Sequence, residues 1–271
     1  MDNKAFLALT IAGSDSGGGA GIQADLKTFM AYNVYGSSVI TAITAQNTLG
    51  VEGIHIIPAE MVEAQINAVI IDIGAHAVKT GMLGSRDIIT AVTKCLKAHA
   101  VGNLVVDPVM VSTSGHRLLH EDAIDMYRSD LLPLALLVTP NLEEAEILSG
   151  QAIDSQISLK EAALRILDLG PKWVLIKGGH SKFGEDKNTV IDLLTNGAIF
   201  EELKNTRIDT VCTHGTGCTL SAAITAGLAR GMDLPGAVKS AEKYLNCALK
   251  SAIPVGKGSG PVNHNHRMPV F

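Results

Sequence analysis

Asp209-Thr-Val-Cys-Thr-His-Gly-Thr-Gly-Cys218 places small residues between an expected strand and an expected long helix. The apolar residues that follow recur at the spacing of one buried helix face, and Gly231 suits the end of that helix. The first turn of a helix has backbone N–H groups without intrahelical partners, and its dipole adds about half a positive charge there. Gly215 and Gly217 let the backbone approach a bound group closely. The segment therefore predicts an anion site at a strand-to-helix turn.

Cys218 falls in the first turn of that helix, where the helix dipole favours a thiolate. We therefore expect Cys218 to be a proton acceptor or nucleophile, and the alternative is a small, buried and inert cysteine. Cys212, His214 and Cys218 together offer only three metal ligands, which does not favour a structural zinc site.

The overall composition is that of an ordinary globular protein. The chain has 271 residues, of which 46% are hydrophobic and 18% are charged, and its net charge is −5 at pH 7. A negative chain without runs of Lys or Arg is not expected to bind nucleic acid. The apolar run at residues 6–12 is too short for a secretory or membrane segment, and the four cysteines do not form a disulfide pattern. We expect a cytoplasmic protein with reduced thiols and no membrane partner.

Short apolar runs alternate with helix-length segments along the chain. Strands are predicted at Phe6–Ala12, Ser38–Thr44, Ala77–Lys79, Leu104–Val106, Leu136–Thr139 and Trp173–Lys177. Nearly continuous apolar strands are typical of a parallel sheet with helices on both faces. Thr189–Leu194 and Ala198–Leu203 flank Asn196-Gly197, which predicts an antiparallel hairpin at a sheet edge. We expect a single three-layer α/β/α domain over residues 1–271, with a mostly parallel central sheet and no separate lid domain.

A second glycine-rich segment, Gly13-Ser-Asp-Ser-Gly-Gly-Gly-Ala-Gly21, follows the first strand and precedes another helix. It lacks the Lys of a P-loop, and no acidic residue follows at the distance that a dinucleotide-binding motif requires. A tight turn at a helix start is the plain alternative. We expect Asp25 to bind a polar group of the substrate, and Asp15 to be a turn or capping residue.

Polar residues also follow two later strands, in Asp107-Pro-Val-Met110 and in Thr139-Pro-Asn-Leu-Glu-Glu144. Asn141 and Glu144 are three residues apart, so they share one face of a starting helix. Because Mg²⁺ keeps several waters and needs few protein oxygens, Asp107, Asn141 and Glu144 are predicted to hold it. A helix cap and an ordinary turn are the alternatives.

Lys177-Gly-Gly-His180 closes a further strand. We expect it to approach nucleotide phosphates, although a glycine-rich corner between strand and helix has the same appearance.

Seven motifs in order carry a family resemblance that spans most of the chain. They are Thr10–Phe29, Ala45–Thr48, Val78–Met82, Asp107–Met110, Thr139–Glu144, Lys177–His180 and His214–Cys218. They resemble the hydroxymethylpyrimidine and phosphomethylpyrimidine kinases of thiamine biosynthesis, in the ribokinase superfamily. The resemblance implies a ribokinase-like fold, ATP as co-substrate, Mg²⁺ and a homodimer. It also implies phosphorylation of 4-amino-5-hydroxymethyl-2-methylpyrimidine to its monophosphate and then to the diphosphate.

The resemblance also assigns the site residues. It implies pyrimidine contacts from Gly13, Asp25, Gln46, Met82 and Val109. It implies a catalytic turn of Gly215, Thr216, Gly217 and Cys218, nucleotide contacts from Lys177, Thr213, Gly215 and Gly217, and MgATP near Asp107, Asn141 and Glu144. Gln46 carries the choice of substrate, because an amide offers both a donor and an acceptor to an aminopyrimidine edge.

Three other functions stay open. A pyridoxine or pyridoxal kinase of the same fold is the nearest, although methionine tends to occupy the position of Gln46 in such relatives. The sugar kinases of the superfamily have Asp where this chain has Cys218, and they carry a β-lid that this sequence does not suggest. A non-catalytic nucleotide-binding module would keep the glycine turn but could lose Asp25, Cys218 or the pair of Asn141 and Glu144, all of which are present in this sequence. The loop Ser112–His116 is expected to be a flexible flap.

Overall fold

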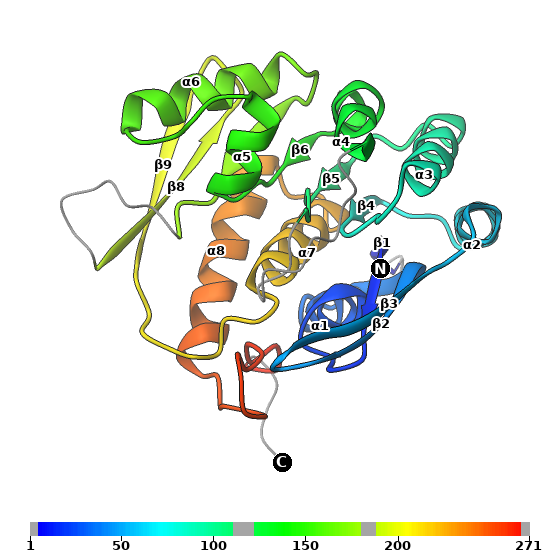
Figure 1. The fold of residues 1–271 in the computed structure, drawn as a ribbon, viewed down its shortest axis with the longest axis horizontal. Helices are drawn as coiled ribbons and strands as arrows, with labels where there is room; N and C mark the ends of the chain where they lie inside the picture. Colours follow the sequence, from blue (N-terminus) through cyan, green and yellow to red (C-terminus); the bar gives the residue numbers. More distant parts are fainter. Residues whose placement is uncertain (1–4, 111–121, 180–187, 267–271) are drawn as a thin grey trace.

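Six parallel strands form the centre of a nine-stranded sheet in the computed structural model, which describes residues 5–110, 122–179 and 188–266. The sheet order is β3-β2-β1-β4-β5-β6-β7-β8-β9 (Figure 1). The parallel strands are β1 (Leu7–Asp15), β2 (Tyr35–Asn47), β4 (Ala77–Thr80), β5 (Leu104–Val106), β6 (Leu137–Val138) and β7 (Trp173–Ile176). Each of them begins within three residues of the strand predicted from the sequence. The predicted flap at residues 112–116 lies outside the described residues.

Antiparallel strands close both edges of the sheet, which is therefore mixed. At one edge β8 (Thr189–Thr195) pairs with β7 and with β9 (Phe200–Thr206), so the hairpin expected around Asn196-Gly197 is present. At the other edge β2 continues to Asn47 and pairs with β3 (Gly50–Ile56). The sequence did not predict this second hairpin, which carries the residues after Thr44 to the carboxyl ends of the parallel strands.

Helices cover both faces of the sheet, as the apolar strands require (Figure 1). One side holds α2 (Ala59–Asp72), α3 (Arg86–Ala98), α4 (Asp122–Met126), α5 (Leu142–Ser149) and α6 (Gln156–Leu167). The other side holds α1 (Gly21–Ala31), α7 (Thr216–Ala229) and α8 (Leu234–Lys250). In β5, Leu104 and Val106 pack into the first core and Val105 into the second. No helix among the described residues has the length and apolar character needed to span a membrane.

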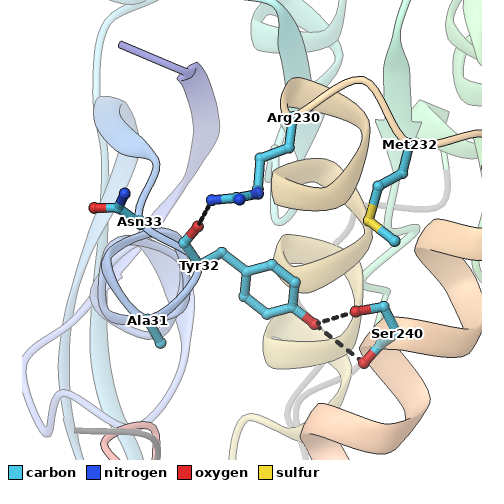
Figure 2. Close-up of a pocket in the computed structure, with 6 residues that line it drawn as sticks. All are labelled: Ala31, Tyr32, Asn33, Arg230, Met232 and Ser240. Atoms are coloured by element: carbon cyan, nitrogen blue, oxygen red, sulfur yellow. Dashed lines mark hydrogen bonds between the residues drawn. The ribbon is translucent and has the colours of Figure 1, made fainter. Parts of the chain in front are cut away.

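Tyr32 joins the three helices of the second face. It follows α1, and its hydroxyl lies 3.1 Å from the carbonyl oxygen of Ser240 on α8 (Figure 2). Arg230, just after α7, donates from its guanidinium to the carbonyl oxygen of Tyr32 at 2.7 Å (Figure 2). These contacts join the C-terminal ends of α1 and α7. Their N-terminal ends also meet, because Gly215 packs against Gly19 at the carboxyl ends of the parallel strands.

The chain after α8 returns to the carboxyl ends of the parallel strands. The backbone N–H of His214 donates to Gly260 at 3.0 Å, and the N–H groups of Lys257 and Gly258 donate to Thr48 Oγ1, each at 3.2 Å. His264 is buried against Thr219 of α7, with Nε2 3.0 Å from the threonine hydroxyl. The tail therefore contacts both the β2–β3 turn and the start of α7.

Candidate active site

A cavity of about 690 Å³ lies at the carboxyl ends of the parallel strands. This is where ligands bind in open α/β sheets, and the volume is in the range of small-molecule sites. Thirteen of the residues predicted for the site line it: Gly13, Gln46, Met82, Asp107, Val109, Asn141, Glu144, Lys177, Thr213, Gly215, Thr216, Gly217 and Cys218. The structure thus brings together residues that are more than 200 positions apart in the sequence.

Asp25 is the exception, because it does not line the cavity. It is fully buried in α1, where Thr10 Oγ1 donates to its carboxylate at 2.6 Å and Lys79 Nζ lies 2.5 Å away. Both carboxylate oxygens are therefore used inside the protein. In this structure Asp25 therefore has no exposed oxygen for the expected contact with substrate.

Lys79 explains why Asp25 is buried. The ammonium group is fully buried and lies 3.5 Å from the carbonyl oxygen of Cys218. Burial lowers the pKa of Lys79, but the carboxylate of Asp25 outweighs it, so the pKa is raised and the side chain stays charged. A lysine inside an otherwise apolar strand was the available sequence signal, because a buried charge needs a partner.

The start of α7 packs directly on the glycine-rich turn after β1. Gly215 is the N-cap of α7 with φ of 78°, and a Cβ there would lie 1.9 Å from the carbonyl oxygen of Gly19. A Cβ on Gly217 would lie 3.4 Å from Lys177 Nζ. The helix start and the ammonium group of Lys177 thus lie side by side in the cavity wall, which suits an anion.

The Cys218 thiol differs from its predicted state. Burial raises the pKa of Cys218 to about 11, although the charge on Lys79 and a hydrogen bond from the N–H of Gly21 act in the other direction. The thiol is therefore protonated at neutral pH in this structure. The cost of burial exceeds the stabilisation by the nearby positive groups, so this structure favours the thiol over the expected thiolate.

Asp107 lies at the centre of a polar cluster after β5. Its Oδ1 is 3.2 Å from Lys177 Nζ, and its Oδ2 accepts a hydrogen bond from Ser221 Oγ at 3.0 Å. Burial raises the pKa of Asp107, but the positive charges of Lys177 and Lys79 more than reverse this, so the pKa is lowered. Asp107 is thus a buried carboxylate that stays ionised at the cavity wall.

Asn141 and Glu144 form a helix cap, which was the alternative to metal binding. The Asn141 side chain accepts from the N–H of Glu144 at 2.9 Å, and the Glu144 carboxylate accepts from the N–H of Asn141 at 2.8 Å. Burial raises the pKa of Glu144 to about 7. Both side chains still line the cavity.

The residues present fit Mg²⁺ only as a partly hydrated ion. Within the described part of the chain, no group of three His, Cys, Asp or Glu side chains has the arrangement of a metal site. Asp107 and Glu144 nevertheless interact electrostatically across one cavity wall. Such a pair suits an ion whose other ligands are waters and phosphate oxygens.

Gln46 lies on the opposite side of the cavity from Asn141 in the sheet order, at the end of β2. Its Oε1 lies 3.1 Å from Thr44 Oγ1, whose hydroxyl also has Ser14 O as an acceptor at 2.8 Å, and its Nε2 lies 3.5 Å from His214 Nε2. The Thr44 contact orients the amide, whose remaining donor and acceptor capacity can serve a ligand.

His214 and Asp15 support this side of the site. Asp15 accepts from the N–H groups of Gly17, Gly19 and Ala20, as a turn-capping residue does, and it lies 2.8 Å from His214 Nε2. Both line the cavity. His214 was not among the predicted site residues, although it stands directly before the glycines of the predicted anion turn.

The comparisons with known proteins agree with this geometry. Residues 15–263 match the family model described as phosphomethylpyrimidine kinase. The hydroxymethylpyrimidine/phosphomethylpyrimidine kinase of Rhizobium meliloti is 51% identical, and the match covers 96% of this chain and 97% of the relative.

Two solved structures are also similar. The ADP complex of Bacillus subtilis pyridoxal kinase has a TM-score of 0.89 and 40% identity, with 97% of this chain and 98% of that chain covered. The phosphomethylpyrimidine kinase of Clostridium difficile has a TM-score of 0.79 and 45% identity, with 90% and 98% covered. With the family model matched over most of the sequence, this chain belongs to the phosphomethylpyrimidine kinase family.

Proposed function

We propose that this protein uses ATP to phosphorylate 4-amino-5-hydroxymethyl-2-methylpyrimidine to its monophosphate and then to the diphosphate, in thiamine biosynthesis. The observation that carries the proposal is one cavity with two chemically different ends. An oriented amide, Gln46, lies at one end, and the cationic start of α7 with Lys177 lies further along it. The names of the relatives match this pairing of a heterocycle with a phosphate donor.

The substrate end is formed by Gln46 with Gly13, Met82 and Val109. Gln46 hydrogen-bonds the aminopyrimidine edge. Gly13 lets Met82 lie close to the backbone, since a Cβ there would be 3.2 Å from Met82 Sδ. Asp25 acts indirectly, through the charge of Lys79 beneath Cys218.

The phosphate end is formed by Thr213 and by the turn of Gly215, Thr216, Gly217 and Cys218. N–H groups at the start of α7 and the ammonium group of Lys177 stabilise the negative charge of the γ-phosphoryl group in the transition state of its transfer. Catalysis of this kind depends on position and electrostatics more than on covalent chemistry.

Mg²⁺ fits beside this end, held by Asp107 and Glu144 with Asn141 nearby. When bound, the ion would neutralise part of the charge on the ATP phosphates. The residues themselves fix the geometry, since Asn141 and Glu144 are locked by the capping box and Asp107 by Ser221.

Cys218 is the proposed acceptor of the hydroxyl proton in the first phosphorylation. Its thiolate forms as the pH rises, and the charge of Lys79 and the N–H of Gly21 favour it. The second phosphorylation has a phosphate oxygen as acceptor, which carries no proton that must be removed.

Pyridoxal phosphorylation is the second candidate activity. The likeness to Bacillus subtilis pyridoxal kinase favours it, since the cavity then suits a related hydroxymethylated ring. Gln46 argues against it as the main activity, because a pyridine offers a different pattern of donors and acceptors.

The test is a product assay with purified protein, MgATP and three substrates in parallel: the hydroxymethylpyrimidine, its monophosphate and pyridoxal. We expect diphosphate to form from both pyrimidines and pyridoxal to react more slowly, with products identified by mass. Gln46→Met should shift the preference toward pyridoxal. Preference of the unaltered protein for pyridoxal would overturn the main proposal, and no turnover of any substrate would favour a nucleotide-binding module.

Three further expectations stay predictions: a single domain over residues 1–271, a homodimer and a cytoplasmic location. Light scattering of the purified protein tests the homodimer. A monomer at micromolar concentration would exclude it.

A further inference from the structure

Two acidic side chains outside the proposed chemistry meet at the wall of the cavity. Asp192 comes from β8 and Glu242 from α8, and both line the cavity while being only 6% and 7% exposed. Their carboxyl groups are within hydrogen-bonding reach of each other. Neither side chain has an assigned role in the reaction described above.

This pair cannot be fully ionised. Two buried carboxylates in contact repel each other strongly, so one of them keeps its proton. Glu242 Oε1 has no N–H or O–H partner among the described residues, whereas Glu242 Oε2 accepts from Asn205 Nδ2 at 2.7 Å. Asp192 accepts the N–H of Gly178 at 2.7 Å, which favours the ionised form there. The geometry thus places the proton on Glu242, facing Asp192.

The pair is the middle of a chain of hydrogen bonds. It starts at the N–H of Gly178, directly after Lys177, and passes through Asp192 and Glu242 to the amide of Asn205. Asn246 Nδ2 on α8 then donates to Asn205 Oδ1 at 2.5 Å. The turn after β7 is therefore fastened to α8 through the two carboxyl groups.

The turn has little freedom to find another position. A Cβ on Gly178 would lie 1.9 Å from the carbonyl oxygen of Ile191, so the turn already packs against β8. Arg207 donates from its guanidinium to the carbonyl oxygen of Gly179 at 2.9 Å. The N–H of Lys177 donates to the carbonyl oxygen of Pro140 at 2.9 Å, and the Asp192 carboxylate adds the contact that orients the N–H of Gly178.

We propose that Asp192 and Glu242 share one proton and that this proton positions the Lys177–Gly179 turn for the phosphates of the nucleotide. They are positioning residues, since they act on the phosphates through the turn. The proposal rests on the proposed function for its ligand, but the sharing of the proton does not depend on it. Burial and the neighbouring Asp192 raise the pKa of Glu242, which agrees with a proton retained at neutral pH.

Among the described residues, the following charged groups lie on the elements around the pair. Burial raises the pKa of Asp192, and the charge of Lys177 at the end of β7 opposes this without reversing it. Arg207, after β9, is directed to Gly179. Lys239 of α8 and Glu201 of β9 pair with each other at 2.7 Å at the surface, and α7 carries no ionisable side chain apart from Cys218. A pH dependence above neutrality therefore points to Glu242 itself.

The first test is calorimetric binding of MgADP at pH 8 and pH 10 to the full chain and to two variants. Glu242→Gln keeps a neutral donor toward Asp192, whereas Glu242→Leu keeps the bulk and loses the donor. At pH 8 we expect the Kd of Glu242→Leu to exceed that of Glu242→Gln about tenfold, the loss of roughly one hydrogen bond to a charged group. From pH 8 to pH 10 the Kd of the unaltered protein should rise about tenfold and that of Glu242→Gln less than threefold.

Equal alkaline weakening in the unaltered protein and in Glu242→Gln would overturn the proposal, because another group would then be titrating. No weakening in either would overturn it as well. Should Glu242→Leu fail to fold, the comparison of the unaltered protein with Glu242→Gln over pH still decides.

Infrared spectroscopy tests the proton without any ligand. At pH 8 the unaltered protein should show the carbonyl stretch of a buried protonated carboxyl group that Glu242→Gln lacks. Glu144, with a pKa near 7, contributes equally to both spectra and cancels in their difference. Absence of the band would overturn the shared proton even if nucleotide binds. Presence of the band without MgADP binding would leave the shared proton standing and overturn both its link to nucleotide and the proposed function.

Discussion

Lys79 and Asp25 show at the scale of single residues how charge is kept inside this protein. The two side chains are fully buried and 2.5 Å apart, beneath the turn that carries Cys218. Removing one partner of such a pair leaves an uncompensated charge, while removing both charges costs far less. The pair therefore gives a matched set of variants.

Lys79→Met should destabilise the protein by about 3–5 kcal/mol, since the Asp25 carboxylate is then buried without its counter-ion. Lys79→Met combined with Asp25→Asn should recover much of this loss, because the amide still accepts from Thr10 and carries no charge. Urea unfolding followed by circular dichroism measures both. Equal destabilisation of the single and double variants would show that packing, and not charge, is what the pair supplies.

Cys218→Ala should lower the rate of the first phosphorylation about 10²–10⁴-fold, the usual contribution of a general base, and should affect the second step much less. Rapid-quench assays with each pyrimidine separate the two steps. In the unaltered protein the first step should accelerate as the pH rises toward the thiol pKa of about 11. Equal losses in both steps would remove the assignment of Cys218 as the base.

Among the secondary-structure elements, the position of the start of α7 depends on one glycine, Gly215. Gly215 and Gly231 flank the same helix, both have positive φ, and only Gly215 has backbone atoms where a Cβ would lie. The two positions thus separate conformational strain from a steric clash.

Gly231→Ala should cost about 1 kcal/mol, the strain of a left-handed conformation without any new contact. Gly215→Ala should cost about 1–3 kcal/mol more, because the methyl group forces α7 away from the carbonyl oxygen of Gly19. Thermal unfolding measures the difference, and MgADP affinity should fall only for Gly215→Ala. Similar stability of the two variants would contradict the tight contact.

The elements also show where prediction from sequence succeeds. Parallel strands such as β5 were found because both of their faces are buried and their apolar runs are continuous. The β2–β3 hairpin was missed because β3 is mostly exposed and carries two glycines, so it lacks an apolar pattern. Side-chain pairs such as Lys79 with Asp25, or Asp192 with Glu242, depend on the order of the strands in the sheet. The local sequence pattern does not contain that order, so these pairs could not be predicted.

At the scale of the whole molecule, the tail secures the site through His264. This side chain is 4% exposed, and Tyr244 donates its hydroxyl to the His264 carbonyl oxygen at 2.8 Å. Burial lowers the pKa of His264 to about 4. The unfolded chain therefore takes up the proton first when the pH falls below the ordinary histidine value.

The sign of the resulting pH dependence follows from linkage. Between pH 6.5 and pH 5 the unfolded state binds this proton and the folded state does not, so stability should fall by about 2 kcal/mol on account of His264. In His264→Gln, which keeps a polar group beside Thr219, that part of the decline should be absent. Urea unfolding at pH 7 and pH 5 measures it. A decline as steep in the variant would mean that His264 is protonated in the folded state too.

The returning tail also has a consequence for synthesis on the ribosome. Gly13 and the glycine turn after it are synthesised long before α7, but His214 takes its backbone partner from Gly260, and Thr219 takes its contact from His264. The anion turn therefore cannot be completed until translation has passed residue 264. A nascent chain that stalls within α8 would hold all the strands of the sheet and yet lack the completed anion turn, which forms only after the segment that follows α8 has been synthesised.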